Sequence, residues 1–164
     1  MFPSAMQDEA ARLLDAFRAR RLRLATVESC TGGLIVALLT EVPGASDVVE
    51  RGVVTYSNQA KQEILRVPES LIDAHGAVSE AVARAMAEGA LEHSHADIAV
   101  SVTGITGPGG GSDAKPVGLV HLAVARRGRV TLHRECHFGD VGRDQVRRKS
   151  VEVALTLLRK ALEA

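Results

Sequence analysis

The chain has 164 residues, and its 20 Lys and Arg balance its 20 Asp and Glu, so it carries no net charge at pH 7. This balance argues against attraction to nucleic acid or to an anionic membrane, and any anion-binding site must therefore be local. With one Tyr, three Phe and no Trp, the chain can hardly build the aromatic platforms that bind single-stranded nucleic acid, and its core must be aliphatic.

The N-terminal region and the cysteines indicate a reducing compartment. Acidic residues stand where a signal peptide carries basic ones, and the longest apolar run, residues 34–39, is far shorter than the roughly 20 residues of a membrane helix. Cys30 and Cys136 lie far apart and form no C-x-x-C pair, which favours free thiols. We expect a cytoplasmic protein with one domain, residues 1–164, and no membrane partner.

Hydrophobic periodicity and turn residues divide the whole chain into helices and strands. In chain order we predict a helix at 4–20, a strand at 22–28, a helix at 34–44, a strand at 47–56, helices at 57–65, 67–76 and 80–94, a strand at 96–104, a hairpin at 119–138 and a helix at 142–164. This order predicts an α/β fold, a three-layer α/β/α sandwich with a mixed β-sheet.

Several local features accompany these elements. Ser4, Ser57 and Ser79 are predicted N-caps of the helices that follow them. The helix at 34–44 is apolar on all sides, which implies that other layers of the protein pack on both sides of it. Gly52 suggests a kink or bulge in its strand, and the hairpin is expected to alternate buried and exposed positions.

Three loops with chemically useful residues follow predicted strands: SCTGG, YSNQAK and GITGPGGGS. Loops at the carboxyl ends of parallel strands meet at one edge of a sheet. If their strands are parallel, these three loops converge on one site.

Ser29 and Lys61 are the candidate reactive residues. Free N–H groups at the start of the helix after Ser29 could bind an oxyanion, but by spacing alone Ser29 fits a helix N-cap better. A lysine in the first turns of a helix opposes the helix dipole, and partial burial would make it a usable base; the alternative is a solvated surface lysine. Tyr56 could orient Lys61 or pack in the core, and Cys30 is an alternative nucleophile or a buried apolar residue.

Anion binding could involve the glycine-rich loop or the last helix. The loop can line a concavity with N–H groups but lacks the P-loop and G-x-G-x-x-G patterns, and a mobile surface loop is the alternative. Arg143 and Arg147 are four residues apart and could hold a phosphate, or could form a solvated basic face. The six histidines lack acidic or cysteine partners at ligand spacing, so we expect no metal.

Five segments occur in order from about residue 12 to the end: ESCTGG, GVVTYSNQAKQEIL, HGAVSEAVARAMAEGAL, VTGITGPGGGSDAKPVGLVHLAV and FGDVGRDQVRRKSV. Together they resemble the CinA C-terminal domain family, the nicotinamide-nucleotide amidohydrolases. The resemblance implies metal-free and cofactor-free hydrolysis of the carboxamide of nicotinamide mononucleotide to nicotinic acid mononucleotide and ammonia. Full-length members carry an N-terminal nucleotide pyrophosphatase domain, so this sequence looks like the stand-alone form.

The resemblance also assigns site residues. The catalytic serine of the family corresponds to Ser29 and the lysine to Lys61, with Tyr56 beside them. We expect oxyanion donors and substrate-binding residues around them. Which of the substrate-binding residues holds the phosphate of the nucleotide is our own inference. The oxyanion donors are the N–H groups of Cys30, Thr31 and Gly32; the substrate-binding residues are Gly104, Thr106, Gly107, Gly109, Gly110, Arg143 and Arg147.

The sequence departs from the family pattern at two positions. Members often have alanine in place of Thr106 and an aromatic residue near His121. Two other functions remain open: a non-catalytic nucleotide-binding module linked to competence or DNA damage, and a cysteine amidase that uses Cys30. The exposed hairpin edge and the apolar helices favour a homo-oligomer.

Overall fold

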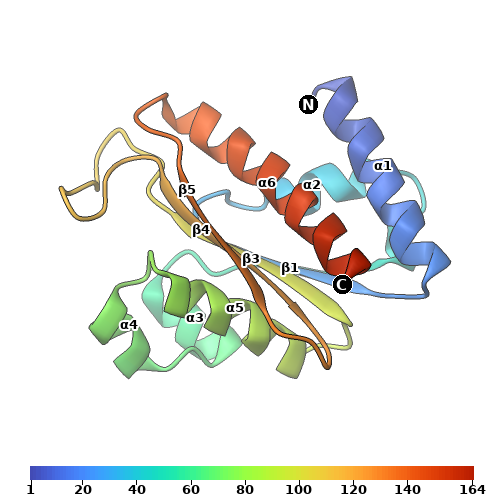
Figure 1. Cartoon of the computed structure of the whole chain (residues 1–164), viewed down its shortest axis with the longest axis horizontal. Coiled ribbons are helices and arrows are strands. Elements are labelled where there is room, and N and C mark those ends of the chain that lie inside the picture. Colours follow the sequence, from blue (N-terminus) through green and yellow to red (C-terminus); the bar gives the residue numbers. More distant parts are fainter.

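The computed structural model describes residues 1–164 and places one five-stranded mixed β-sheet between two layers of helices (Figure 1). The elements are α1 (Ser4–Ala19), β1 (Leu24–Glu28), α2 (Leu34–Thr40), a 3-10 turn (Ala45–Asp47), β2 (Val49–Val54), α3 (Asn58–Leu65), α4 (Glu69–His75), α5 (Glu80–Glu92), β3 (Ile98–Gly104), β4 (Leu119–Arg126), β5 (Leu132–His137) and α6 (Arg143–Glu163). The predicted three-layer α/β/α sandwich is confirmed.

The strand order across the sheet is β2-β1-β3-β4-β5. β1 runs parallel to both β2 and β3, whereas β4 is antiparallel to β3 and to β5. The three strands that precede the SCTGG, YSNQAK and GITGPGGGS loops are therefore parallel. Their loops meet at one edge of the sheet, as the sequence predicted.

Each face of the sheet has its own apolar core. Helices α1, α2 and α6 cover one face, and α3, α4 and α5 cover the other (Figure 1). The sheet residues under α5 include four alanines, Ala25, Ala99, Ala123 and Ala125. These small side chains let α5 approach the strands closely, so the elements that carry the site are packed on a rigid layer.

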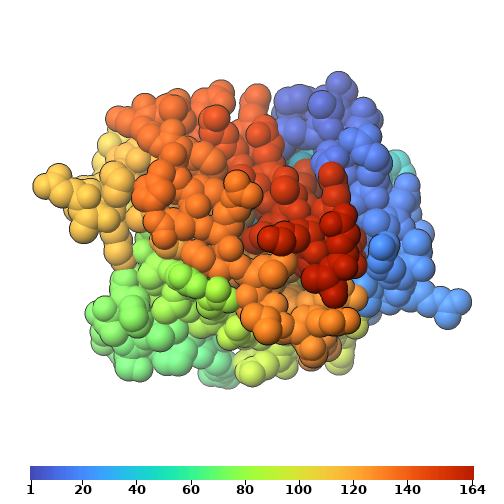
Figure 2. All heavy atoms as spheres, in the orientation of Figure 1, coloured from blue at the N-terminus to red at the C-terminus, as the bar shows by residue number.

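The termini and the glycine-rich loop occupy different parts of the surface. α1 and α6 pack side by side, and the loop between β3 and β4 projects from the body of the molecule (Figure 2). No helix has the length and apolar character needed to span a membrane.

The predicted caps at Ser57 and Ser79 are confirmed, since each hydroxyl accepts a hydrogen bond from a helix N–H, at 3.0 and 3.3 Å. The predicted cap at Ser4 is wrong. Pro3 is the N-cap of α1, and its carbonyl accepts from the N–H groups of Met6 and Gln7.

Three further expectations are corrected by the packing. α2 is buried only along Ile35, Leu38 and Leu39, and it contacts the sheet as well as α1 and α6. The register of β1 and β2 shifts beside Leu24 and not at Gly52. β4 does not alternate but is buried on both faces, because α5 and α6 both pack on it.

Candidate active site

Ser29 occupies the turn directly after β1, the second strand from the edge of the sheet. Its N–H donates to the Val102 carbonyl of β3 at 3.1 Å, which fixes the serine backbone to the sheet. The turn closes when the Gly32 N–H donates to the Ser29 carbonyl at 3.0 Å. Gly32 and Gly33 have φ values of +61° and +99°, a region that residues with a Cβ rarely adopt, so the turn requires this glycine pair.

Glu28 holds the other side of this turn. Its buried carboxylate accepts hydrogen bonds from the Thr31 hydroxyl at 2.6 Å, the Ile35 N–H at 3.0 Å and the Val36 N–H at 2.9 Å. The first N–H groups of α2 are thus occupied by Glu28. The expectation that this helix directs its N–H groups at the target of Ser29 is wrong, because the carboxylate stands at the helix terminus.

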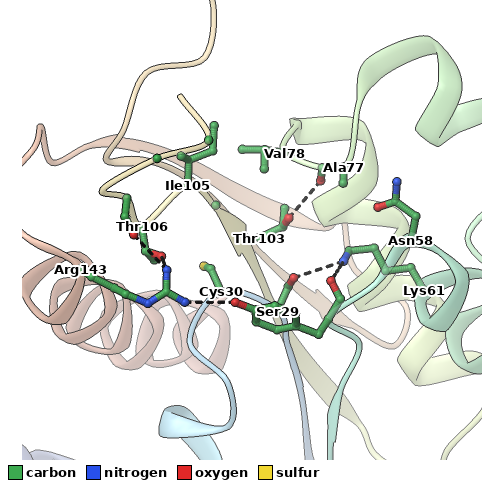
Figure 3. A pocket seen from close by; sticks show the side chains of 15 residues that line it. Ser29, Cys30, Asn58, Lys61, Ala77, Val78, Thr103, Ile105, Thr106 and Arg143 are labelled. Carbon is green, nitrogen blue, oxygen red and sulfur yellow. Dashed lines mark hydrogen bonds between the residues drawn. The ribbon is translucent and has the colours of Figure 1, made fainter. Parts of the chain in front are cut away.

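Lys61 reaches Ser29 from α3, across the neighbouring loop. Its Nζ donates to Ser29 Oγ at 3.2 Å, to the Thr55 carbonyl at 2.8 Å and to the Tyr56 carbonyl at 3.4 Å (Figure 3). Thr55 is itself tied to β1, since its N–H donates to the Glu28 carbonyl at 2.9 Å. The serine and lysine are therefore held by connected backbone segments.

The environment of Lys61 destabilises its charged ammonium form. The residue is 1% exposed, and all three acceptors of Nζ are uncharged. Burial lowers the pKa of the Lys61 ammonium from its usual value, because it penalises the charged form. An amine of lowered pKa beside a hydroxyl can act as a general base.

Cys30 lies next to Ser29 but in a different chemical state. Burial raises the pKa of the Cys30 thiol to about 12, and the Glu28 carboxylate adds to this effect. A thiol of such a pKa stays protonated at neutral pH and is a poor nucleophile. The N–H groups of Cys30 and Thr31 donate to no backbone acceptor, whereas the Gly32 N–H is occupied by the Ser29 carbonyl.

A cavity of about 290 Å³ opens beside the serine and lysine. Figure 3 shows Lys61 and Asn58 at one end and Thr106 and Arg143 at the other, with Ser29 between them. The lining residues are Ser29, Cys30, Tyr56, Asn58, Lys61, Ala77, Val78, Thr103, Gly104, Ile105, Thr106, Gly107, Gly109, Gly110 and Arg143.

The glycine-rich loop supplies backbone donors to this cavity. The N–H groups of Thr106, Gly107, Gly109 and Gly110 have no backbone acceptor. Gly107 has a φ of +78°, and a Cβ at Gly104 would lie 2.7 Å from the side chain of Val120. Glycine at these positions allows the backbone itself to form the cavity wall.

Arg143 closes the far end of the cavity from the first residue of α6. Nη1 donates to the Thr106 hydroxyl at 2.6 Å and to the Gly107 carbonyl at 3.0 Å, and Nη2 donates to the Tyr56 hydroxyl at 3.1 Å. Every one of these acceptors is uncharged, so none compensates the guanidinium. Tyr56 is 61% exposed, and its hydroxyl contacts Arg143 while only its carbonyl contacts Lys61.

Arg147 lies one turn further along α6 and does not line the cavity. Its Nη2 donates to the Thr31 carbonyl at 3.0 Å, behind the serine turn. The structure thus brings Arg143 to the cavity and leaves Arg147 as a contact of the ESCTGG segment. Thr31 and Gly32 also lie outside the cavity lining.

The assembled sequence agrees with a known family over nearly its whole length. Residues 6–162 match the model of the CinA C-terminal domain. The chain belongs to this family. The assignment that the five segments suggested is therefore confirmed, and the chain is a CinA C-terminal domain.

Relatives and solved structures of CinA proteins agree with this assignment. The CinA-like protein of Anaeromyxobacter sp. (strain K) is 52% identical over 157 residues, which cover 95% of this chain but only 38% of that relative. The competence/damage inducible protein CihA from Agrobacterium tumefaciens has a TM-score of 0.96 at 49% identity, with 100% of this chain and 99% of that chain covered. The CinA superfamily protein ECK1530/EC0983 from Escherichia coli has a TM-score of 0.91 at 33% identity, with 98% and 94% covered.

Sequence reasoning missed several residues of the CinA site. Glu28 stands within ESCTGG and Asn58 within YSNQAK, so the segments contained both without indicating their roles. Thr103 is the penultimate residue of β3 and donates to the Ala77 carbonyl at 3.0 Å, which brings the α4–α5 connection to the cavity. Only the tertiary structure shows that this connection forms a wall.

Proposed function

We propose that this CinA domain hydrolyses the carboxamide of nicotinamide mononucleotide to nicotinic acid mononucleotide and ammonia, with Ser29 as nucleophile and Lys61 as base. The observation that supports the reaction type best is the 3.2 Å contact between Lys61 Nζ and Ser29 Oγ inside a buried environment. A structural lysine would place its ammonium in water, because burying a charge is costly. The nucleotide is named from the resemblance to the family.

The proposed chemistry needs only groups of this chain. Neutral Lys61 takes the proton of Ser29 Oγ, and Oγ adds to the carboxamide carbon. The N–H of Cys30, a residue of the cavity lining, has no backbone acceptor and donates to the oxyanion. Lys61 then gives its proton to the departing nitrogen, the C–N bond breaks, and ammonia leaves an acyl ester on Ser29.

The second half of the reaction releases the acid. Water adds to the ester carbon while Lys61 takes its proton, and the C–O bond to Ser29 breaks as that proton returns to Oγ. The serine and lysine are restored, and the freed carboxylic acid loses its proton to solvent. The transfers between Ser29 and Lys61 join two groups that are already in contact in the structure.

Arg143 is the group proposed to bind the phosphate of the nucleotide. Its guanidinium lies at the opposite end of the cavity from Lys61 and is bound only by uncharged acceptors. Arginine binds phosphate through charge-assisted hydrogen bonds. A nucleotide whose ring faces Ser29 could place its phosphate there.

Two alternatives compete with this proposal. A cysteine amidase would use Cys30, but the raised pKa of its thiol disfavours that role. A non-catalytic nucleotide-binding module would keep the cavity and Arg143 without turnover. The buried Lys61 amine beside Ser29 favours the enzyme, since a binding module gains nothing from it.

Ammonia release from nicotinamide mononucleotide separates these functions. The wild type should release ammonia, and Ser29→Ala and Lys61→Ala should each lower kcat by about 10³-fold or more. Cys30→Ala should retain turnover, with Cys136→Ala as the matched control for a buried cysteine outside the cavity. Loss in Cys30→Ala but not in Ser29→Ala would move the nucleophile. Nucleotide binding without ammonia from the wild type would favour the binding module.

The phosphate contact has its own test. Arg143→Met should raise KM for nicotinamide mononucleotide more than it lowers kcat, whereas Arg148→Met, an exposed arginine of the same helix, should have no effect. Equal kinetics for the two variants would remove Arg143 from the site.

A further inference from the structure

Thr106 is the one cavity residue of the glycine-rich segment that carries a hydroxyl. Its side chain is 4% exposed, and its Oγ1 accepts the hydrogen bond from Arg143 Nη1 at 2.6 Å. The proposed Ser29–Lys61 chemistry makes no use of this hydroxyl.

The Thr106 hydroxyl keeps a hydrogen for a ligand. A threonine hydroxyl is both a donor and an acceptor, and Thr106 uses only its acceptor capacity within the protein. The neighbouring buried hydroxyls Ser101 and Thr103 both donate, to the carbonyls of Ala83 and Ala77. Thr106 thus differs from them in having an unused donor.

The contact with Arg143 makes this donor stronger. When a hydroxyl accepts from a charged group, the bond polarises its own O–H toward the next acceptor. Arg143 retains its Nε–H and one N–H on Nη2, because the protein uses two hydrogens on Nη1 and one on Nη2. These donors and the unpaired N–H groups of Thr106 and Gly107 surround one end of the cavity.

We propose that Thr106 is a specificity-determining residue whose hydroxyl, bridged to Arg143, binds the phosphate of a nucleoside monophosphate substrate. This inference rests on the proposed function and adds the residue that selects the phosphorylated substrate over the free nucleoside. A chain with alanine at this position would hold its arginine without this bridge. The hydroxyl both positions the guanidinium and contacts the anion.

The test compares two substrates that share the carboxamide. Thr106→Val keeps the shape of the side chain but removes the hydroxyl, and Thr106→Ser restores it. Relative to the wild type, Thr106→Val should raise KM for nicotinamide mononucleotide about tenfold, the effect of one hydrogen bond to a charged group. The preference for the mononucleotide over nicotinamide riboside in kcat/KM should fall by a similar factor, and Thr106→Ser should recover most of it.

Thr156→Val is the matched control, because its hydroxyl donates to the Glu152 carbonyl on the exposed side of α6. This variant should keep the wild-type preference. If Thr106→Val loses kcat/KM equally for the mononucleotide and the riboside, the hydroxyl has only a structural role and the proposal fails. An unchanged preference would also overturn it.

A binding measurement separates this inference from the proposed function. Inorganic phosphate should raise the Tm of the wild type, and the increase should be smaller in Thr106→Val than in Thr156→Val. If phosphate stabilises the wild type through Thr106 but no ammonia is released from nicotinamide mononucleotide, the anion site stands and the amidohydrolase proposal fails. If phosphate stabilises the wild type and Thr106→Val equally, or neither, the anion site at Thr106 is refuted.

Discussion

Replacement of Glu28 by alanine should destabilise the domain severely, although this residue touches no substrate. The carboxylate is fully buried and accepts from three donors, the Thr31 hydroxyl and the N–H groups of Ile35 and Val36. Each buried donor left without a partner costs about 1–3 kcal/mol. Even if the hydroxyl of Thr31 rotates to another acceptor, two backbone donors at the start of α2 remain, which gives a loss of about 2–6 kcal/mol.

Such a loss is a large part of the roughly 5–15 kcal/mol that stabilises a domain of this size. Urea denaturation followed by circular dichroism should show it as a lower midpoint at an unchanged m-value. The midpoint of Glu28→Gln should lie between those of the wild type and Glu28→Ala. An amide keeps one oxygen as an acceptor, but its NH₂ group faces donors that the second carboxylate oxygen had bound. Glu69→Ala, in the exposed first turn of α4, is the control and should cost at most about 0.5 kcal/mol. A Glu28→Ala midpoint equal to that of the control would refute the assignment of Glu28 as the cap of α2.

Three further outcomes follow from burial and packing. Burial lowers the pKa of Lys61, and in the proposed mechanism its neutral amine is the base. The value of kcat/KM should therefore rise with pH through that lowered pKa and level off below the usual lysine value of about 10.4; a profile flat from pH 6 to 10 would contradict this role. Burial also lowers the pKa values of His121 and His133, so the unfolded chain binds protons more tightly than the folded one. The contribution of the two histidines to stability should therefore be complete above about pH 6.5. It should be lost as the pH falls from there through the lowered pKa values of the folded state, by up to about 1.4 kcal/mol per pH unit for each histidine. Equal urea midpoints at pH 5 and 7.5 would exclude this contribution. Gly89→Ala should lower the Tm, because its Cβ would overlap the last carbonyl of α3, whereas Gly109→Ala has open space; equal Tm values for the two variants would show that α5 can move aside.

The sheet could be predicted from the sequence because its signals are local, whereas the pairing of Ser29 with Lys61 also needed the resemblance to the family. Periodicity and turn residues marked the strands, and three loops with polar residues at strand ends indicated one edge of the sheet. Lys61 stood out because a cation near a helix start is unfavourable unless it has a function. The structure places that lysine against Ser29.

What could not be predicted depends on how elements dock. Arg143 and Arg147 share a helix face at four-residue spacing, yet only the first reaches the cavity, because α6 crosses the site at its first turn and its next turn lies behind Thr31. Glu28 looked like the last residue of a strand. Its bonds to N–H groups seven and eight residues later depend on the glycine turn between them.

The position of Arg143 determines when the site is completed during synthesis. The Ser29–Lys61 contact spans 32 residues, so both side chains have left the ribosome before the antiparallel half of the sheet exists. The bond between Arg143 and the Tyr56 hydroxyl spans 87 residues, and Arg143 is held in place only when α6 has docked on the sheet. A nascent chain that ends after β5 therefore contains Ser29 and Lys61 but not the arginine end of the cavity, and under the proposed function it would lack the group that binds the phosphate.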